Sequence, residues 1–334
     1  MKIDAQAIRS YLTRWESLLA IATILFIALA AATTPGLLSP ASLTNAFQVV
    51  AEKSLLVLPL LLLIIGREID ISVASVGAFA AVAVGLLTQA GVPFALAVVL
   101  GLVVGGLCGA LNGFCVAVLG MPSLVVTLGS LALFRGLCYV FLGSTPITAS
   151  IPPDLITWSY GTFLGWVPNN LIPFLVLVPV FAIALHRRPI GRQIYAIGGG
   201  PDVARYSGVK VLRLRFWLFV VSGAVAAIAG IIAIGRTSQV TPDSMVGYEL
   251  DAITVVFLGG VSFLGGAGRM TGVLWSLLLI VMLRQTLLLQ GQGQYAQGLA
   301  VGLLLIGSLL LANVSQRVGA WITNRRLRAA AQAA

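Results

Sequence analysis

The stretch HRRPIGRQIYAIGGGPDVARYSGVKV, residues 186–211, is the longest part of the chain that is too polar and charged to lie inside a lipid bilayer. Seven of the chain's twenty Lys and Arg residues fall within it or just after it. Pro201 at a first helical position, Asp202 in the first turn and Gly208 just past the end are start and stop signals of a short helix. We therefore predict a short, self-capped helix inside a basic loop.

The predicted helix has one apolar face, because Val203, Tyr206 and Val209 recur three residues apart while Asp202 and Arg205 lie off that face. A small helix of this kind, held at a membrane surface, can enter a groove on another protein. The alternative is an ordinary basic loop, since short helical patterns also arise by chance.

The composition indicates a membrane protein. Of the 334 residues 59% are hydrophobic and 9% are charged, with a mean hydropathy of +1.05, whereas roughly a quarter of the residues of a soluble protein carry charge. We predict an all-α, polytopic membrane protein. The net charge of +10 does not indicate a nucleic-acid partner, because the basic residues cluster between apolar segments and suit anionic membrane lipid.

Ten segments approach the length of about 20 apolar residues that a membrane-crossing helix needs. They are 17–37, 45–65, 71–88, 92–119, 123–142, 170–185, 212–234, 250–264, 270–289 and 297–313. We interpret the chain, 1–334, as one transmembrane domain with its membrane region at 17–313. The second and third segments are the least regular, because Glu52, Lys53 and the sequence GREID interrupt them.

The basic residues predict the orientation. With a cytoplasmic N-terminus, sixteen of the twenty Lys and Arg residues lie on the inner side, and Lys53, Arg135, Arg236 and Arg284 remain for outer or intramembrane positions. Positive charge gathers in cytoplasmic loops. Both termini, the loop 186–211 and the basic tail 314–334 are therefore expected in the cytoplasm.

Polar residues at membrane depth are candidates for a solute path, since an ionisable group there costs about 2.5–3.5 kcal/mol on insertion scales. The candidates are Glu68, Asp70, Ser72, Asn112, Thr127, Ser130, Arg135, Glu249 and Asp251. Internal ion pairing, or a carboxylate at a helix N-terminus, is the alternative role for Glu68 and Asp70. A path with many hydroxyl and amide groups and little fixed charge favours a neutral, hydroxyl-rich solute.

A four-residue glycine repeat marks the fourth segment as a packing helix. Glycines in this spacing lie on one helix face and let two backbones approach closely in lipid. The repeat consists of Gly101, Gly105, Gly109 and Gly113.

Motifs for catalysis are missing from the sequence. It has no GxxxxGK[ST] phosphate loop, no GxSxG or HExxH motif, and a single histidine, His186. We predict no catalytic residues, metal site or cofactor on this chain. If the chain takes part in ATP-driven transport, the ATPase must lie on another chain, and the exposed loop helix is where that chain would bind.

Five further stretches carry a family resemblance: IDISVASVGAFAAVAVG at 69–85, PSLVVTLGSLALFRGL at 122–137, GRQIYAIGGGPDVARYSGVKV at 191–211, FLGGVSFLGGAGRMTGVLWSLLL at 257–279 and QGLAVGLLLI at 297–306. Together they resemble the permease subunit of the ribose/autoinducer-2 type of bacterial ABC importers. The family usually has two glycines before Ile-Asp-Leu-Ser, where this chain has Arg67 and Glu68. That variant is similar to the rhamnose and autoinducer-2 branches.

The resemblance implies an ABC importer permease fold in the bacterial inner membrane and uptake of a sugar such as ribose or rhamnose, or of autoinducer-2. It implies three partners: a cytoplasmic ATP-binding subunit that holds ATP and Mg, a periplasmic sugar-binding protein, and a second permease chain, identical or different. The residues that would couple this chain to the ATPase are Pro201, Asp202, Val203, Ala204, Arg205, Tyr206, Ser207 and Gly208.

Two other classes remain open from the residues alone. An ion-coupled secondary sugar transporter would use the carboxylate pairs Glu68/Asp70 and Glu249/Asp251 and would need no ATPase. A membrane-embedded enzyme would need a nucleophile, base or metal set, and the sequence offers no such set.

Overall fold

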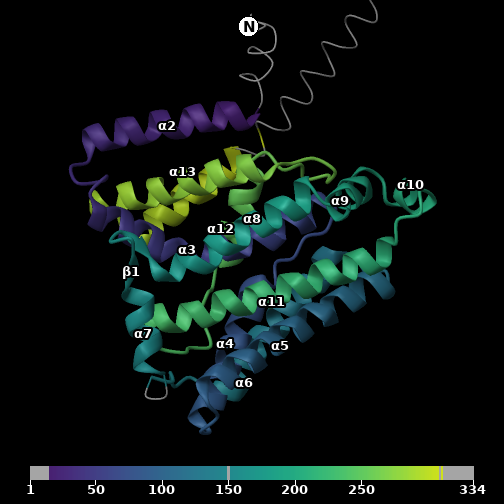
Figure 1. Cartoon of the computed structure of the whole chain (residues 1–334), viewed down its shortest axis with the longest axis horizontal. Helices are drawn as coiled ribbons and strands as arrows, with labels where there is room; N and C mark the ends of the chain where they lie inside the picture. The colour runs from purple at the N-terminus through teal and green to yellow at the C-terminus, as the bar shows by residue number, and fades with distance from the viewer. Residues whose placement is uncertain (1–14, 149–150, 308–309, 311–334) are drawn as a thin grey trace, which may run out of the picture.

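The computed structural model describes residues 15–148, 151–307 and 310. The predicted all-α fold is confirmed: long helices run side by side through the molecule, and in the described part of the chain the strands form one small hairpin (Figure 1). Within the described residues, seven helices are long and apolar enough to cross a membrane, and two more apolar helices, Val73–Gln89 and Gln294–Gly307, are shorter. The basic tail 314–334 lies outside the described residues.

The long helices are listed here with their bounds: α2 Trp15–Thr33, α3 Pro40–Ile65, α4 Val73–Gln89, α5 Phe94–Gly113 with a π-helical extension η1 Phe114–Val118, α6 Ser123–Leu142, α8 Ile172–His186, α11 Val211–Thr237, α12 Tyr248–Leu258 and α13 Met270–Leu289. The last helix, Gln294–Gly307, follows. Short elements lie between them: α7 Pro153–Tyr160, β1 Thr162–Phe163, β2 Val167–Pro168, η2 Asn169–Leu171, α9 Pro189–Gly199 and α10 Pro201–Tyr206.

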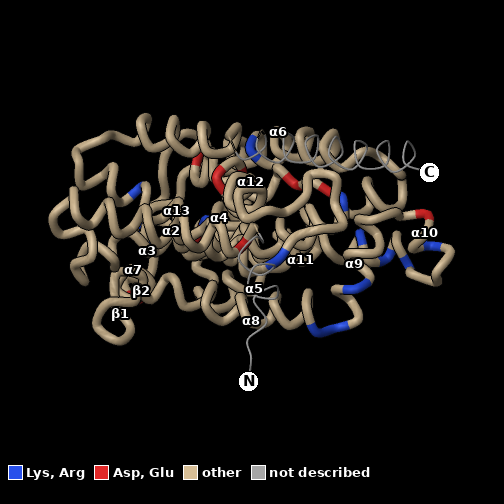
Figure 2. The backbone as a smooth tube through the Cα atoms, turned by 90° about the horizontal axis from the view of Figure 1, so that it is seen from above, with Lys and Arg blue, Asp and Glu red and all other residues tan. Residues whose placement is uncertain are grey.

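The bundle has two different ends. At one end, here called the hairpin end, α7 and the antiparallel β1–β2 hairpin lie beside the start of α3, where Thr44 Oγ1 donates to Trp166 O at 2.6 Å (Figure 1). At the opposite end, here called the α10 end, α9 and α10 extend beyond the long helices, and Lys and Arg residues gather around them (Figure 2). The positive charge of the described residues is therefore concentrated at the α10 end.

Helix α3 forms the centre of the bundle. It begins with Pro40 after the N-cap Ser39, whose side chain accepts from Ser42 N at 3.3 Å. From Ser54 to Ile65 every residue is buried. A helix that is apolar all round, without a polar face, is surrounded by other protein. Here the surrounding helices include α8, α11, α12 and α13.

The glycine repeat of α5 lies against α11. A Cβ atom at Gly105 or Gly109 would collide with backbone atoms of Gly223 and Phe219 on α11, and one at Gly113 would meet Phe216. Gly101 instead lies against the Val84 side chain of α4. The two helix backbones thus touch directly, which is how lipid-embedded helices gain dispersion energy without a hydrophobic driving force.

The helix predicted at 250–264 is shorter than expected, although the chain does pass from the hairpin end, where Val240 bonds to Ile147, to the α10 end, where Gly266 bonds to Ile65. Helix α12 ends at Leu258 after eleven residues, and at 1.5 Å per residue it is only roughly 16 Å long, about half a bilayer. The chain then turns through Gly260, Gly265, Gly266 and Gly268, all at positive φ. Gly266 N donates to Ile65 O at 2.8 Å, so this turn closes against the end of α3. Apolar composition alone does not show where such glycines stop a helix.

The predicted break at GREID between the second and third segments is confirmed, whereas Glu52 and Lys53 do not interrupt α3. Helix α3 ends at Ile65 and α4 begins at Val73. Between them Arg67 has φ +68°, and Glu68 N donates to Leu63 O at 2.9 Å, which closes the turn. The GREID sequence is thus a short connection between two helices, in which Glu68 and Asp70 are buried and Arg67 is exposed.

Candidate functional site

Helix α10 presents two large apolar side chains to the outside. Tyr206 is 93% exposed and Val203 is 71% exposed, whereas Ala204 is buried against the rest of the chain. The helix begins with Pro201 after Gly200 and ends before Gly208, whose φ is +85°. Gly208 N donates to Arg205 O at 3.0 Å. The helix is therefore held in place from beneath while its outer face stays open for contact.

Val209 does not share the exposed face, contrary to the spacing argument. It follows the helix, its N–H donates to Ala204 O at 3.0 Å, and its side chain packs partly buried against the core. The positive φ of Gly208 turns the chain between Tyr206 and Val209, so the three-residue period stops there.

Helix α9 fixes α10 to the bundle. Gly198 lies so close to the backbones of Ile65 and Gly266 that a Cβ atom would collide with both. Tyr195 Oη donates to Gly268 O at 2.6 Å, and burial raises the pKa of that phenol, which keeps it protonated as a donor. A movement of α9 and α10 would therefore be transmitted to the end of α3 and to the loop after α12.

Glu68 forms an ion pair with the start of α11. Arg215 Nε lies 2.8 Å from Glu68 Oε1, and the Glu68 side chain is 6% exposed. Burial raises the pKa of the Glu68 carboxyl, and the positive charge of Arg215 opposes that shift. The pair joins the GREID connection to the helix that carries the chain away from α10.

A closed polar network surrounds Asp70. Its Oδ1 accepts from Ser72 N at 3.0 Å and from Ser72 Oγ at 2.6 Å, and its Oδ2 accepts from Ser222 Oγ of α11 at 3.0 Å. Asn112 Nδ2 of α5 donates to Ser72 Oγ at 2.8 Å. The network continues through two side chains of α6: Ser130 Oγ donates to Asn112 Oδ1, and Thr127 Oγ1 donates to Ile69 O at 3.1 Å.

Five candidate residues, Asp70, Ser72, Asn112, Thr127 and Ser130, therefore lie together, although they come from two helices and one connection. Side-chain hydrogen bonds link four of them, Thr127 bonds to the Ile69 carbonyl, and all five are buried. This geometry gives them a clear part in holding α4, α5, α6 and α11 in register, and contact with a solute stays a prediction for each of them.

Arg135 and Glu249 lie elsewhere. Arg135 Nη1 donates to Pro242 O at 2.6 Å and to Ser244 O at 2.7 Å, and so holds the segment that connects α11 to α12. Glu249 is in the first turn of α12. Neither residue joins the Asp70 network.

A second polar cluster, here called the charged cluster, lies in the interior between α3, α11, α12 and α13. Asp251 Oδ2 accepts from Lys53 Nζ and its Oδ1 accepts from Arg284 Nη2, each at 2.6 Å. Next to it, Arg236 Nε donates to Glu52 Oε1 at 2.6 Å and Arg236 Nη2 donates to Tyr248 Oη at 3.1 Å. Of these residues the sequence marks Asp251 as a candidate for the solute path and Arg284 as a polar residue at membrane depth.

The sequence does contain a sign of the basic residues of the charged cluster that were not among the candidates. Lys53 and Arg236 are two of the four basic residues that the orientation argument could not place on the inner side. A charge left at membrane depth needs a partner. The opposite charges at Glu52 and Asp251 could have been paired with them, although the sequence gives no way to choose which pairs with which.

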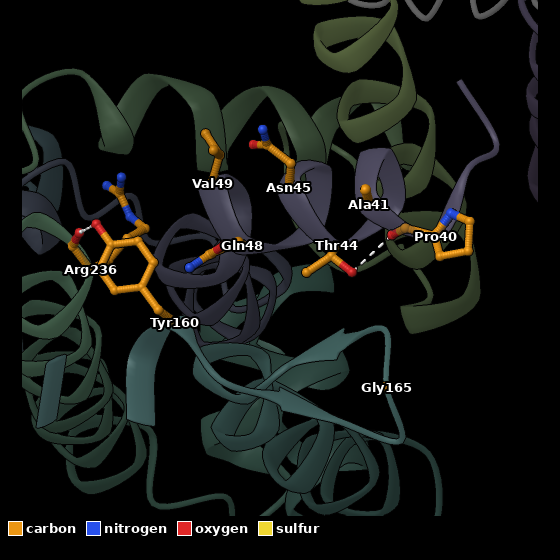
Figure 3. A pocket seen from close by; sticks show the side chains of 9 residues that line it. All are labelled: Pro40, Ala41, Thr44, Asn45, Gln48, Val49, Tyr160, Gly165 and Arg236. Atoms are coloured by element: carbon orange, nitrogen blue, oxygen red, sulfur yellow. Dashed lines mark hydrogen bonds between the residues drawn. The ribbon is translucent and has the colours of Figure 1, made fainter. Parts of the chain in front are cut away.

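Two cavities border the charged cluster. One, of about 560 Å³, opens at the hairpin end and is lined by Thr44, Asn45, Gln48, Tyr160 and Arg236 together with smaller residues (Figure 3). The other, of about 570 Å³, lies between α12, α13 and the last helix and is lined by Lys53, Tyr248, Asp251 and Arg284 among others. Arg236 lines the first cavity and Tyr248 the second, so their hydrogen bond lies between the two.

Known proteins similar to this chain are transport components. The ribose import permease protein RbsC of Haemophilus influenzae is 33% identical over 88% of this chain and 91% of its own length. The autoinducer 2 import system permease protein LsrD of Photorhabdus laumondii subsp. laumondii is 33% identical over 80% of this chain and 83% of its own. The ribose import permease protein RbsC of Bacillus subtilis is 32% identical over 83% and 86%.

No solved structure matches the chain. Residues 42–312 match the family described as branched-chain amino acid transport system / permease component. That range includes α3 to α13, the Asp70 network, the charged cluster and α10. The chain therefore belongs to the family of permease components of branched-chain amino acid transport systems.

Proposed function

We propose that this chain is the transmembrane permease subunit of a binding-protein-dependent ABC importer in a bacterial inner membrane. Its cargo would be a neutral monosaccharide or sugar-like solute of the ribose, rhamnose or autoinducer-2 type. The observation that carries the proposal is α10, where Val203 and Tyr206 are exposed on a short helix that α9 fixes to α3. Exposed apolar side chains on a short, firmly held helix can bind in a groove on a partner protein.

The proposal assigns the two ends of the bundle. The α10 end and both termini would be cytoplasmic, where an ATP-binding subunit carrying ATP and Mg would contact residues 201–208. The hairpin end would receive a periplasmic sugar-binding protein. A second permease chain would complete the membrane part. Closure of the ATPase would then move α9 and α10 and turn the cavity from one side to the other, as in alternating access.

The ion-coupled alternative is less well supported by the charges. A coupling carboxylate must release its partner to take up a cation, but Asp251 is bound by two cations and Glu52 by Arg236. Asp70 accepts from three hydroxyl and amide donors. A non-hydrolysing partner ATPase would stop uptake under the ABC proposal and leave it unchanged under the ion-coupled one.

Replacing Tyr206 by Ala, or Val203 by Ala, should reduce ATP-dependent D-ribose uptake by about tenfold or more, because buried anchors dominate the free energy of an interface. Amounts of the chain in the membrane should stay normal, because neither side chain packs within it. Val140 is a matched control at 76% exposure on α6, and Val140→Ala should leave uptake unchanged. Normal uptake by both α10 variants would contradict the proposed contact.

Gly208→Val should weaken coupling more than insertion. No heavy atom lies within 4 Å of a Cβ at this position, so the change acts only through the backbone, where φ is +85°. A β-branched residue in that conformation costs about 1–2 kcal/mol, enough to shift α10 but not to unfold the bundle. We expect sugar-stimulated ATPase activity to fall while the chain still reaches the membrane. Unchanged ATPase stimulation in this variant would refute the role given to the cap.

A further inference from the structure

The second cavity has the size and composition of a small-molecule site. Its volume of about 570 Å³ falls within the range of ligand pockets, roughly 300–1,000 Å³. Polar side chains enter it from four helices: Lys53 of α3, Asp251 and Thr254 of α12, Arg284 of α13, and Gln294 with Tyr295 of the last helix. Gly298 and Gly302 lie along the same wall and leave it open.

The charged groups there keep hydrogen-bonding capacity beyond their ion pairs. Each oxygen of Asp251 accepts one donor within the cluster, and a carboxylate oxygen has room for a second. Lys53 and Arg284 each use one N–H toward Asp251 and carry further donors. All three side chains are 13–16% exposed, so they reach the cavity. The acceptor Asp251 therefore lies between the two donors Lys53 and Arg284 on the cavity wall.

Aromatic rings flank this part of the wall. Lys53 Nζ lies 4.5 Å from the centroid of the Tyr248 ring. Tyr295 is 95% exposed at the start of the last helix. Within the described part of the chain, neither Gln294 nor Tyr295 uses its side chain in a hydrogen bond. An exposed ring on the wall of a cavity, with its hydroxyl unused in a hydrogen bond within the described residues, is available to a ligand.

We propose that this cavity binds a neutral sugar: vicinal hydroxyl groups donate to Asp251 and accept from Lys53 and Arg284, and the ring stacks against Tyr295. A hydroxyl both donates and accepts, so a pair of them matches a carboxylate flanked by two cations. This inference rests on the proposed function, and it adds the place within the membrane where the transported sugar would bind. The cavity at the hairpin end would then be the vestibule, separated from the sugar site by the Arg236–Tyr248 hydrogen bond.

A labelling experiment tests binding without any transport. The full chain is placed in nanodiscs with Gln294→Cys and with Cys115, the half-buried one of the three native cysteines, changed to Ser. Millimolar D-ribose should slow N-ethylmaleimide modification at position 294 about fivefold or more, as expected of a bound solute that covers the thiol. L-Rhamnose is the second neutral probe. Protection by D-ribonate would show whether the cavity, in which two cations face one carboxylate, prefers an anion to a neutral sugar.

The matched control is Leu299→Cys, which is on the same helix at 67% exposure but does not line the cavity. Its labelling should not respond to sugar. Equal labelling at position 294 with and without ribose and rhamnose would overturn the inference, and so would protection by ribonate alone.

Uptake by the intact transporter separates this inference from the proposed function. Tyr295→Ala should lower the amount of sugar moved per ATP hydrolysed about fivefold or more, by loss of one stacking contact, with sugar-stimulated ATPase activity retained. Leu299→Ala should behave as wild type. If the wild-type system takes up no sugar with ATP, the proposed function is refuted. The labelling experiment at position 294 does not depend on transport, so it still tests whether sugar binds in the cavity. A working wild type with an unaffected Tyr295→Ala refutes the site alone.

Discussion

Asp251→Asn should make the chain fail to accumulate in the membrane in folded form. The carboxylate lies 2.6 Å from both Lys53 Nζ and Arg284 Nη2. Removing its charge leaves two buried cations facing each other, and breaking a buried ion pair at one side costs about 3–5 kcal/mol. That is a large part of the usual net stability of a folded protein. We expect the purified variant to show a greatly lowered Tm and a low yield of monodisperse protein.

Asp243→Asn is the matched control, because Asp243 is exposed in the segment before α12 and forms no ion pair within the described residues. It should leave Tm unchanged. The double variant Asp251→Asn with Arg284→Gln restores the original net charge of the cluster, and it should recover part of the lost stability. If Asp251→Asn alone were as stable as wild type, the ion pairs would not hold α12 against α3 and α13.

Hydropathy predicted most of the helices because membrane depth imposes a length. The segments 123–142 and 270–289 match α6 and α13 at both ends. Start and stop residues predicted α10 for a related reason: Pro201 and Gly208 act through their own backbone angles, so they need no tertiary information. Hydropathy and helix start and stop residues therefore predict those elements whose conformation depends on neighbouring residues in the sequence.

The errors fall where the cause is distant in the sequence. Residues 253–258 are as apolar as a crossing helix, but α12 stops because the following glycines turn the chain back against Ile65, almost two hundred residues earlier. Lys53 and Asp251 are 198 positions apart, and Glu52 and Arg236 are 184 apart. A charge at membrane depth predicts that a partner exists, but only the packing of α3 against α11 and α12 decides which partner it is.

The Asp70 network shows an intermediate case. The sequence marked Asp70, Asn112 and Ser130 as unusual because polar groups in a bilayer need partners. It could not show that the network connects them, since the connection before α4 has to meet α5 before Ser72 can accept from Asn112, and α6 has to join before Ser130 can donate to Asn112. Once they do meet, the network fixes the register of the helices whose close approach the glycine repeat of α5 permits.

Gly109→Val should separate α5 from α11 and destabilise the bundle by roughly 3 kcal/mol, the upper part of the usual range for overpacking. A Cβ at this position would collide with the backbone of Phe219, and backbone atoms cannot move aside as a side-chain end can. The same displacement would pull Asn112, one turn along α5, away from Ser72. The measured effect should therefore exceed the steric cost alone, because the Asp70 network would lose a hydrogen bond at the same time.

Gly106 provides the control for this prediction, because it is on the same helix and a Cβ there meets no heavy atom within 4 Å. Gly106→Val should change stability by only about 0.5 kcal/mol, the difference in helix propensity between the two residues. The measurement is the urea or thermal midpoint of the purified chain, compared for both variants. Equal midpoints would mean that the α5–α11 contact tolerates a methyl-sized separation, and the network around Asp70, not the glycine face, would then set the distance between the two helices.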